Sequence, residues 1–545
     1  MNTGPDFPFD TKHWVESPFG LGIVPKKVQG TEVGIIGAGM AGTAAGYELM
    51  KLGMRSVMYE SAGIGGRLRT WSFSEAPGTI ADLGGMRFSS ASTLFHHYVK
   101  VLGLQTKPFP NPLTAAAGST VIELEGERYY AESPGDLPLP FHEVADAWIE
   151  ALRTEAQFAE LQEAMRTRDL PGLKSLWNHL VLTWDDRSFF DFVTTSRSFA
   201  ALTFRHRELF GQVGFGTGGW DTDFSHSMLE ILRVVITNLE GEQHLVIGGA
   251  AQVPRGLWSH APDHCAYWPS GTSLSSLNDG KPRPEVTRIA RSADGQIMVV
   301  DAHGGVKKFE AVLVTCQNRV LVSNIDCEQS LFSPQMWTAL NKTHYMPSSK
   351  VFVVVDRPFW KDKDRDTGRD VMSMTLTDRL TRSTYLFDSG VQGPAVICLS
   401  YCWMKDALGM LPHSVERRVE LALSALQEIY PGIDIGDHII GEPITVSWEA
   451  DRNFLGAFKC TLPGHYRYDR RMFTHFMQRD MPARHRGIFV AGDDKSWTPG
   501  WVEGAITTSM NAVWGIMTHL GGRTSPENPG PGDLFDKLQP LLMGD

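Results

Sequence analysis

The segment GIIGAGMAG, residues 34–42, constrains the fold of this chain more than any other feature. Gly37, Gly39 and Gly42 follow the spacing G-x-G-x-x-G between an apolar, β-prone run (EVGII) and a stretch with helical periodicity (TAAGYELMKLG). In a strand–turn–helix unit the first glycine permits the tight turn, the second lets the backbone approach a pyrophosphate, and the third lets the helix pack on the strand. The segment therefore predicts a dinucleotide-binding unit. The alternative is a Gly-rich turn in an ordinary α/β domain.

The residues after this unit indicate which kind of dinucleotide it binds. The next predicted strand, RSVMYE, ends in Glu60, whose carboxylate can accept hydrogen bonds from ribose hydroxyls. The segment that follows, SAGIGGRLR, places Gly66 and Arg67 beside the predicted pyrophosphate. An NAD-binding domain has no need of such a segment. Near the other end of the chain, GIFVAGDDKSWTPGWVEGA supplies a second strand–turn–helix element, in which Gly492 permits close approach and Asp493 can hydrogen-bond a ribityl chain. These two elements favour a flavin over a nicotinamide.

Composition and charge argue against several classes of partner. A chain of 545 residues is long enough for more than one domain. Its net charge of −11 and the lack of a long basic run argue against nucleic acid, and no apolar run is long enough to span a bilayer. The six cysteines are scattered without a C-x-x-C pair or a zinc framework, so no metal is expected. With no signal-peptide pattern at the start, the expected compartment is the cytoplasm.

Taken together, these motifs resemble those of FAD-dependent amine and L-amino-acid oxidases. GPDFPFD, FGTGGWDTDF, HYMPSSKVFVVVDRPFWKDKD, VSWEAD and NPGPGD extend the resemblance to the bacterial L-lysine 2-monooxygenase/oxidase group, over nearly the whole chain. The long motifs are specific, whereas the first glycine fingerprint alone is not. The resemblance implies FAD as the cofactor, bound by Gly37, Gly39, Met40, Ala41, Gly42, Glu60, Ser61, Gly66, Arg67, Gly85, Met86, Arg87, Val286, Gly492, Asp493, Trp501 and Val502.

The order of the predicted elements indicates an α/β fold. A Rossmann-like FAD-binding domain is assembled from discontinuous segments and carries an α+β substrate domain and a helical insertion. The segment 142–167 has the pattern of one amphipathic helix, with Val144, Trp148, Ile149 and Leu152 on one face. The predicted boundaries are an N-terminal arm wrapping the surface over 1–30, FAD-binding segments over 31–90, 245–320 and 450–520, a largely helical insertion over 91–244, a substrate-binding segment over 321–449, and an irregular tail over 521–545.

Two cationic residues are predicted to carry catalysis. Arg87, in GGMRF, can form a bidentate pair with a substrate carboxylate, and the family has its carboxylate-binding arginine at this position. The alternative is a surface ion pair. Lys350 enters the apolar run VFVVV, where burying an ammonium is costly. The resemblance implies that it contacts flavin N5 through a water and aids the reaction with O2, while a lysine snorkelling from the strand edge is the alternative.

The side-chain pocket of the substrate is predicted from GGWDTDF. Asp221 and Asp223 precede a predicted helix, which either could cap, but lysine-specific members of the family use an acid at the position of Asp223 to hold the distal ammonium. The lysine monooxygenases have a cysteine at the position where this chain has Leu239. The bulkier leucine could reshape the pocket, which favours an oxidase. The aromatic residues expected to wall the pocket are Trp403, Phe458 and Trp501. Each of them could instead be an ordinary residue of the hydrophobic core. The resemblance also implies that the backbone near Trp501 helps to hold the substrate carboxylate.

The resemblance implies an FAD-dependent L-lysine oxidase, which converts L-lysine, O2 and water into 6-amino-2-oxohexanoate, NH3 and H2O2. An L-lysine 2-monooxygenase, forming 5-aminopentanamide, CO2 and water, is an alternative, as is an oxidase of arginine or ornithine. An NAD-dependent dehydrogenase would leave AGDD…GWVEGA without a role, and a flavin-containing binding protein would not be reduced by an amino acid. The N-terminal arm and the long helical insertion would suit a homodimer.

Overall fold

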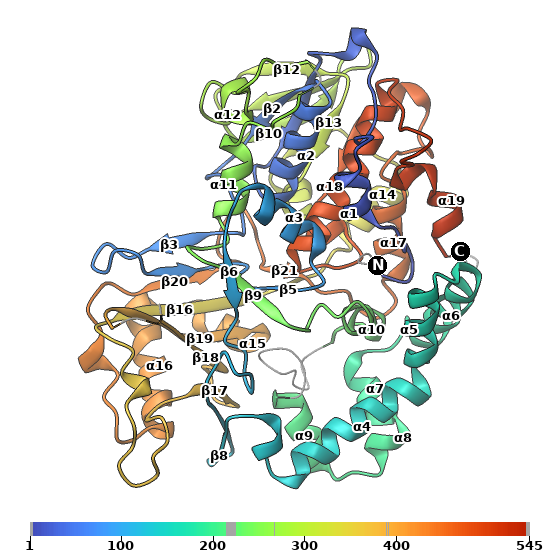
Figure 1. Cartoon of the computed structure of the whole chain (residues 1–545). Coiled ribbons are helices and arrows are strands. Elements are labelled where there is room, and N and C mark those ends of the chain that lie inside the picture. The colour runs from blue at the N-terminus through green and yellow to red at the C-terminus, as the bar shows by residue number, and fades with distance from the viewer. Residues whose placement is uncertain (1–3, 214–224, 266, 389, 391, 541–545) are drawn as a thin grey trace.

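The computed structural model describes residues 4–213, 225–265, 267–388, 390 and 392–540 (Figure 1). Its first layer is a four-stranded parallel sheet in the order β2-β1-β13-β22. The strands are Glu32–Ile36 (β1), Arg55–Tyr59 (β2), Val312–Val314 (β13) and Ile488–Val490 (β22). Strands from distant parts of the chain therefore share one sheet, which confirms the predicted α/β fold with a Rossmann-like unit built from discontinuous segments.

Helices from opposite ends of the chain pack together on this sheet. α2 (Met40–Lys51) follows the glycine turn and packs against α18 (Val502–His519), which is buried along nearly its whole length. Ser509 Oγ donates a hydrogen bond to Ala41 O (2.8 Å) and ties the two helices together. Figure 1 shows them side by side in blue and red, with α3 (Thr93–Val101) and α11 (Gln252–Ser259) completing the layer.

Shorter elements complete the half of the molecule that contains the parallel sheet. A second four-stranded sheet has the order β12-β11-β10-β14 and consists of Val286–Arg291 (β10), Ile297–Asp301 (β11), Val306–Phe309 (β12) and Asp326–Cys327 (β14). The other elements of this half are Thr70–Ser72 (β3), Ile80–Asp82 (β4), Tyr345–Met346 (β15), Phe458–Lys459 (β21), Leu274–Leu277 (α12), Asn318–Ser323 (α13), Pro334–Asn341 (α14) and Tyr466–Thr474 (α17). β15 pairs with β21 and β3 pairs with β4, both in antiparallel register.

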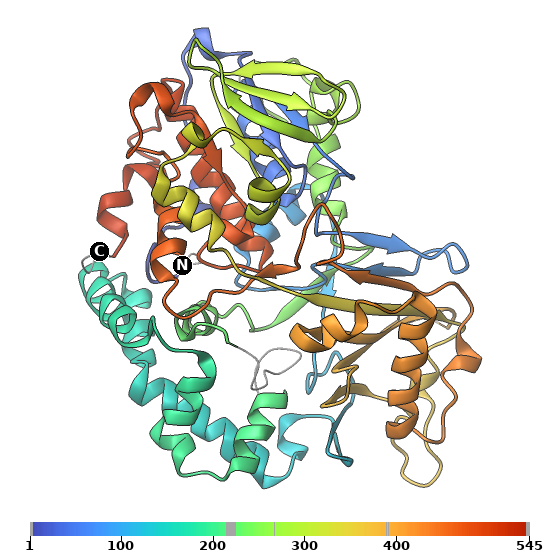
Figure 2. The ribbon, with the colours of Figure 1, turned by 180° about the vertical axis from the view of Figure 1, so that it is seen from behind.

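A seven-stranded sheet forms the second lobe (Figures 1 and 2). Its strand order is β20-β16-β19-β18-β17-β7-β8. The strands are Thr120–Leu124 (β7), Glu127–Ala131 (β8), Ser348–Val355 (β16), Met374–Thr377 (β17), Ser383–Phe387 (β18), Ala395–Trp403 (β19) and Ile444–Ser447 (β20). α15 (Met404–Met410) and α16 (Val415–Ile429) pack on β16 and β19. Two of the strands, β7 and β8, come from the segment 91–244.

The start of the segment 91–244 differs from the predicted largely helical insertion. β7 and β8 form a hairpin joined by Glu125 and Gly126, with φ angles of +51° and +85°. Two central residues with positive φ match the right-handed twist of a two-residue hairpin, which explains why this stretch forms strands. A three-stranded sheet of Phe88–Ser89 (β5), Gln243–Val246 (β9) and Thr106–Pro108 (β6) also includes residues from this segment.

The helices of the insertion form an arch in teal and green at the lower right of Figure 1. They are Leu139–Glu155 (α4), Phe158–Thr167 (α5), Leu170–Trp184 (α6), Phe189–Thr195 (α7), Arg197–Ala200 (α8), Phe204–Val213 (α9) and Met228–Ile236 (α10). The single helix predicted over 142–167 is wrong, because Gln157 adopts a left-handed φ of +49° between α4 and α5. Ile149 is 63% exposed, since it is rotated by 100° from Trp148 and leaves the buried stripe. Across the described residues, no helix combines the length and apolar character that a membrane span requires.

The N-terminal arm is more deeply integrated than a surface wrap. Asp6 is fully buried, and its Oδ2 lies 2.6 Å from Arg233 Nη2 of α10. The Arg233 guanidinium also lies 4.8 Å from the ring centroid of Trp497, beside the parallel sheet. Trp14, in α1 (Thr11–Glu16), is buried as well, and its carbonyl accepts a hydrogen bond from Asn528 Nδ2 of the C-terminal tail (3.1 Å). The tail contains α19 (Phe535–Leu538). The arm therefore links the insertion, the parallel-sheet domain and the tail.

Candidate active site

A cavity of about 550 Å³ opens at the carboxyl edge of the parallel sheet. Residues within three positions of the ends of β1, β2, β13 and β22 all contribute to its walls. This edge is where open α/β sheets bind their ligands. The predicted cofactor and substrate residues that line it are Gly37, Gly39, Met40, Ala41, Glu60, Ser61, Gly66, Arg67, Gly85, Arg87, Val286, Lys350, Phe458, Gly492, Asp493, Trp501 and Val502.

The glycine turn at the end of β1 has no room for a side chain on the side that packs against the protein. Gly37 adopts a φ of +103°, which residues with a side chain rarely adopt. A Cβ added to Gly42 would lie 2.0 Å from Gly37 O, so α2 could not approach the turn. A Cβ at Gly39 would meet Gly65 O at 3.8 Å and Gly66 Cα at 3.9 Å, which are ordinary contacts. A side chain at Gly39 would therefore occupy the cavity rather than displace protein.

Glu60 lies at the end of β2 and is held across the glycine turn. Its Oε2 accepts a hydrogen bond from Ala38 N (2.7 Å), and its Oε1 accepts one from Ala62 N (2.9 Å). These contacts fix the carboxylate at the cavity wall, the location from which an acid after the second strand reaches a ribose.

Arg67 and Asp493 join the two ends of the chain at the cavity. Arg67 Nη1 donates to Asp493 Oδ2 (3.0 Å) and Nη2 donates to Oδ1, so the pair is bidentate. Arg67 Nη1 also donates to Ala457 O (2.9 Å). Burial opposes the charge of Arg67, but Asp493 outweighs it and raises the pKa of the guanidinium. The contact holds the loop after β2 against the turn after β22.

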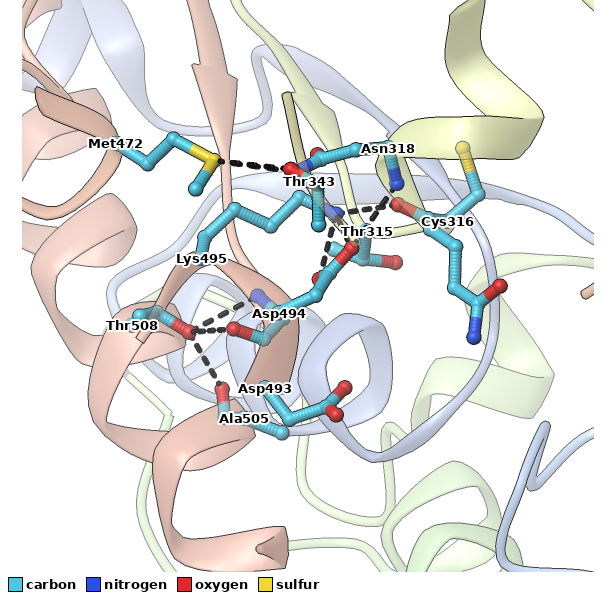
Figure 3. Close-up of polar contacts among 12 residues, drawn as sticks. Thr315, Cys316, Asn318, Thr343, Met472, Asp493, Asp494, Lys495, Ala505 and Thr508 are labelled. Carbon is cyan, nitrogen blue, oxygen red and sulfur yellow. Dashed lines mark hydrogen bonds and ion pairs between the residues drawn. The ribbon is translucent and has the colours of Figure 1, made fainter. Parts of the chain in front are cut away.

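The next two residues, Asp494 and Lys495, form a fully buried ion pair (Figure 3). Lys495 Nζ lies 2.9 Å from Asp494 Oδ1 and donates to Cys316 O (2.5 Å). Asp494 Oδ2 accepts hydrogen bonds from Asn318 N (3.0 Å) and from the hydroxyl of Tyr345. Burial raises the pKa of Asp494, but the neighbouring cations outweigh burial and hold it below its usual value. The pair ties the turn after β22 to the end of β13, to α13 and to β15.

Arg87 follows the GGM turn and lies on the wall of the cavity. Its Nη1 donates to Asn111 Oδ1 (3.1 Å) and to Tyr385 Oη (3.1 Å), and the guanidinium lies 5.4 Å from the ring centroid of Phe109. Burial opposes the charge, but Tyr385 and Glu240 outweigh it and raise the pKa of Arg87. The arginine is therefore a positioned, permanently charged group at the cavity, as carboxylate binding requires.

Lys350 is buried within β16, in which every position is buried. Its Nζ donates to Gly84 O (2.6 Å) and Asp82 O (3.2 Å) and lies 4.7 Å from the ring centroid of Tyr401. Burial lowers the pKa of Lys350 to about 8. With 3% of its surface exposed, the side chain does not snorkel to solvent, which excludes that alternative. Its ammonium instead lies at the cavity, next to the turn that leads to Arg87.

An aromatic wall adjoins the two cations. Tyr401 and Trp403 lie on the same face of β19 because they are two residues apart. Their ring centroids are 5.5 Å apart, and Trp403 lies 5.6 Å from Phe458 in an edge-on arrangement. Tyr401 and Phe458 line the cavity, whereas Trp403 packs between them. Tyr401 was not predicted, although its i, i+2 spacing from Trp403 in LSYCW was a usable signal.

Several predicted site residues do not line this cavity. Gly42 packs against the glycine turn, Met86 belongs to the core around the seven-stranded sheet, and Leu239 is 1% exposed. These three residues are not among those that line the cavity, so their contacts with FAD or substrate stay predictions. Asp221 and Asp223 lie outside the described residues.

Comparison with known proteins places the chain in a family. A family model described as flavin containing amine oxidoreductase matches residues 40–517. The chain belongs to this flavin-containing amine oxidase family. It is 29% identical to a tryptophan 2-monooxygenase of Pseudomonas savastanoi, over 94% of this chain and 93% of that protein. It is 26% identical to an L-amino-acid oxidase of Siganus canaliculatus, over 92% and 88% of the two chains.

Solved structures of flavin amine oxidases share the fold. Putrescine oxidase superposes with a TM-score of 0.65 at 16% identity, over 90% of this chain and 99% of that one. Cyclohexylamine oxidase from Brevibacterium oxydans gives 0.63 at 16% identity, with the same coverage. The predicted fold class and cofactor are confirmed, as is membership of the broad amine oxidase family, whereas the lysine-specific group within it stays a prediction. The protein is an FAD-dependent oxidoreductase of the amine oxidase family.

The residues of the cavity fit FAD. The free side of Gly39 leaves room for a pyrophosphate, and Glu60 would offer a fixed carboxylate to the ribose of the adenosine. Asp493, held by Arg67, would face the hydroxyls of the ribityl chain. α18 begins at Val502 on the cavity wall, so its positive dipole end lies at the ligand space.

Two glycine variants of the amine oxidase turn are expected to fail in different ways. Gly42→Ala should destabilise the apoprotein, because the new methyl overlaps with Gly37 O. Gly39→Ala should leave apoprotein stability nearly unchanged but weaken FAD binding at least tenfold, because the methyl occupies the pyrophosphate space. Thermal unfolding of apoprotein and titration with FAD, followed by flavin fluorescence, measure the two effects. An equal loss of apoprotein stability in both variants would contradict this account.

Proposed function

We propose that this enzyme oxidises a basic L-amino acid at Cα, with L-lysine as its first candidate. The observation that carries the proposal is Arg87, which Asn111 and Tyr385 position on a cavity wall shared with Lys350. A positioned guanidinium suits the α-carboxylate that distinguishes an amino acid from a simple amine. Support for a basic side chain comes from the sequence resemblance, which implies that Asp223 is the acid that lysine-specific members use to hold the distal ammonium. A cytoplasmic homodimer stays a prediction.

The residues of the protein orient the substrate and set the charge around it. Bound FAD supplies the acceptor for a hydride from Cα and passes the electrons to O2. Arg87 would hold the carboxylate so that the Cα–H faces the cofactor in a near-attack geometry. Lys350, fixed by Gly84 O and Asp82 O, would place an ammonium where negative charge develops as O2 is reduced. Its pKa of about 8 keeps most of this lysine protonated at neutral pH.

The fate of the imine decides between two activities. In an oxidase the imine leaves and hydrolyses to the oxo acid and NH3, and H2O2 is released. We propose this outcome because Leu239 replaces the cysteine of the lysine monooxygenases. The second candidate is oxidative decarboxylation to an amide, CO2 and water. It is favoured by the tryptophan 2-monooxygenases among the relatives, which match more than nine-tenths of this chain.

Turnover of L-lysine in air tests the proposal. H2O2 and NH3 formed in step with O2 consumption would support the oxidase, whereas 5-aminopentanamide formed in place of H2O2 would support the monooxygenase. L-arginine, L-ornithine, L-norleucine and L-tryptophan are compared under the same conditions. A higher kcat/KM for L-tryptophan than for every basic amino acid would overturn the proposed substrate class.

Asp223→Asn is expected to raise the KM for L-lysine at least tenfold. Loss of the carboxylate would leave the distal ammonium without a partner in a desolvated pocket. The KM for L-norleucine, which lacks that ammonium, should change less than twofold. Asp221→Asn, which removes the same charge two residues earlier, serves as the matched control. Equal losses for lysine and norleucine would contradict the role of Asp223.

A further inference from the structure

A carboxylate, Glu240, stands behind Arg87 at the end of a side-chain relay. It follows Asn238, whose φ of +56° turns the chain after α10 toward β9. Arg87 Nη1 donates to Asn111 Oδ1 (3.1 Å), and Asn111 Nδ2 donates to Gln243 Oε1 (2.8 Å). Gln243 Nε2 in turn donates to Glu240 Oε2 (3.3 Å). The direction of each hydrogen bond is fixed, because an amide that accepts at its oxygen must donate at its nitrogen.

Glu240 and Arg87 act on each other electrostatically. Burial raises the pKa of Glu240, and Arg87 is the cation that partly offsets this. In return, Glu240 helps to raise the pKa of Arg87. Gln243, between them, is buried. In such a weakly solvated place, charges interact over several ångströms more strongly than they do in water.

We propose that Glu240 determines which substrate side chains this site accepts, by disfavouring acidic side chains and favouring cationic ones. The inference rests on the proposed function, because it assumes that Arg87 receives the α-carboxylate of an amino acid. Once that carboxylate neutralises Arg87, the charge of Glu240 is no longer balanced. A second carboxylate on the substrate is then repelled, whereas a distal ammonium restores the balance.

The isosteric variant Glu240→Gln isolates this charge. The amide oxygen at position 240 can still accept from Gln243 Nε2, so the relay to Arg87 is kept while the negative charge is lost. Two substrate pairs of matched shape report the effect: L-lysine with L-norleucine, and L-glutamine with L-glutamate. The kcat/KM ratio of lysine to norleucine and that of glutamine to glutamate are both expected to fall at least fivefold, with norleucine turnover changed less than twofold.

Glu242→Gln is the matched control. Glu242 is exposed, and its change removes the same charge two residues away, so both ratios should stay within twofold of wild type. Glu240→Asp, which keeps the charge, should do the same. Glu240→Asp also tests the proposal if Glu240→Gln does not fold. Because the aspartate keeps the negative charge, a fivefold fall of both ratios in this variant would overturn the proposal.

The two substrate pairs separate this inference from the proposed function. If the wild-type enzyme does not prefer lysine to norleucine, the proposed substrate class fails, but the glutamine-to-glutamate ratio still measures the effect of Glu240. Unchanged ratios in Glu240→Gln, with normal flavin absorbance and unfolding temperature, would overturn the role of Glu240 whatever the best substrate is.

Discussion

Replacing Arg87 with leucine is expected to lower kcat/KM for the amino-acid substrate by roughly a hundredfold to a few thousandfold. Leucine retains apolar contact with Phe109 but leaves the α-carboxylate desolvated and without its partner. Removing one partner of a buried charge pair costs about 3–5 kcal/mol, which corresponds to this range. Cadaverine, which is L-lysine without its carboxylate, should lose less than threefold. Steady-state O2 consumption with the two substrates measures the difference.

Arg87→Lys separates charge from geometry in the same assay. Lysine keeps the positive charge but cannot form the bidentate fork, so its effect on L-lysine turnover should lie between those of wild type and Arg87→Leu. Flavin absorbance of each purified variant shows whether the cofactor is still bound, since Arg87 lies in the wall of the same cavity. If Arg87→Leu affects lysine and cadaverine equally, the arginine does not bind the carboxylate.

The parts of the site that depend on neighbours in sequence were open to prediction. The glycine turn was visible because an apolar strand, three spaced glycines and a helical pattern follow one another within a short segment. Glu60 was visible because it ends the next strand, and Lys350 because an ammonium inside VFVVV is costly unless it serves a purpose. Gly37, Gly39, Glu60 and Lys350 all line the cavity.

Features made by contacts between distant segments were not predicted. Arg67 and Asp493 are 426 positions apart, and nothing local shows that they pair. The relay to Glu240 also requires knowing that β9 lies beside β5. The composition of the N-terminal segment led to a wrong prediction. Its proline and glycine content indicated a surface arm, whereas Asp6 within it is buried. The break at Gln157 has no glycine or proline to mark it, so a periodic pattern continues across two helices.

The buried pair of Asp494 and Lys495 was not predicted either, because nothing in the sequence shows that both neighbours are buried. The second large effect is expected there. Lys495→Met should lower the free energy of unfolding by about 3–5 kcal/mol, because it leaves the Asp494 carboxylate buried without its paired ammonium, and only the guanidinium of Arg67 still acts on it from a distance. Tyr345 and Asn318 still donate to that carboxylate, but neither neutralises it. The double variant Lys495→Met/Asp494→Asn should recover most of the loss, since its neutral amide fits the same space. Thermal unfolding of the apoproteins measures the whole cycle.

The pH dependence of this loss distinguishes a missing charge from a packing defect. In the wild type the pKa of Asp494 is below its usual value, so the ion pair contributes stability that is lost only in acid. In Lys495→Met the largest effect that opposes burial is lost and only Arg67 still opposes it, so the pKa of Asp494 is expected to rise. Protonation then relieves the buried charge, so the deficit relative to wild type should shrink as the pH falls from 8 toward 5. A deficit that stays constant over this range would mean that Lys495 contributes packing alone, and the turn that presents Asp493 to the cofactor would not depend on the charge pair.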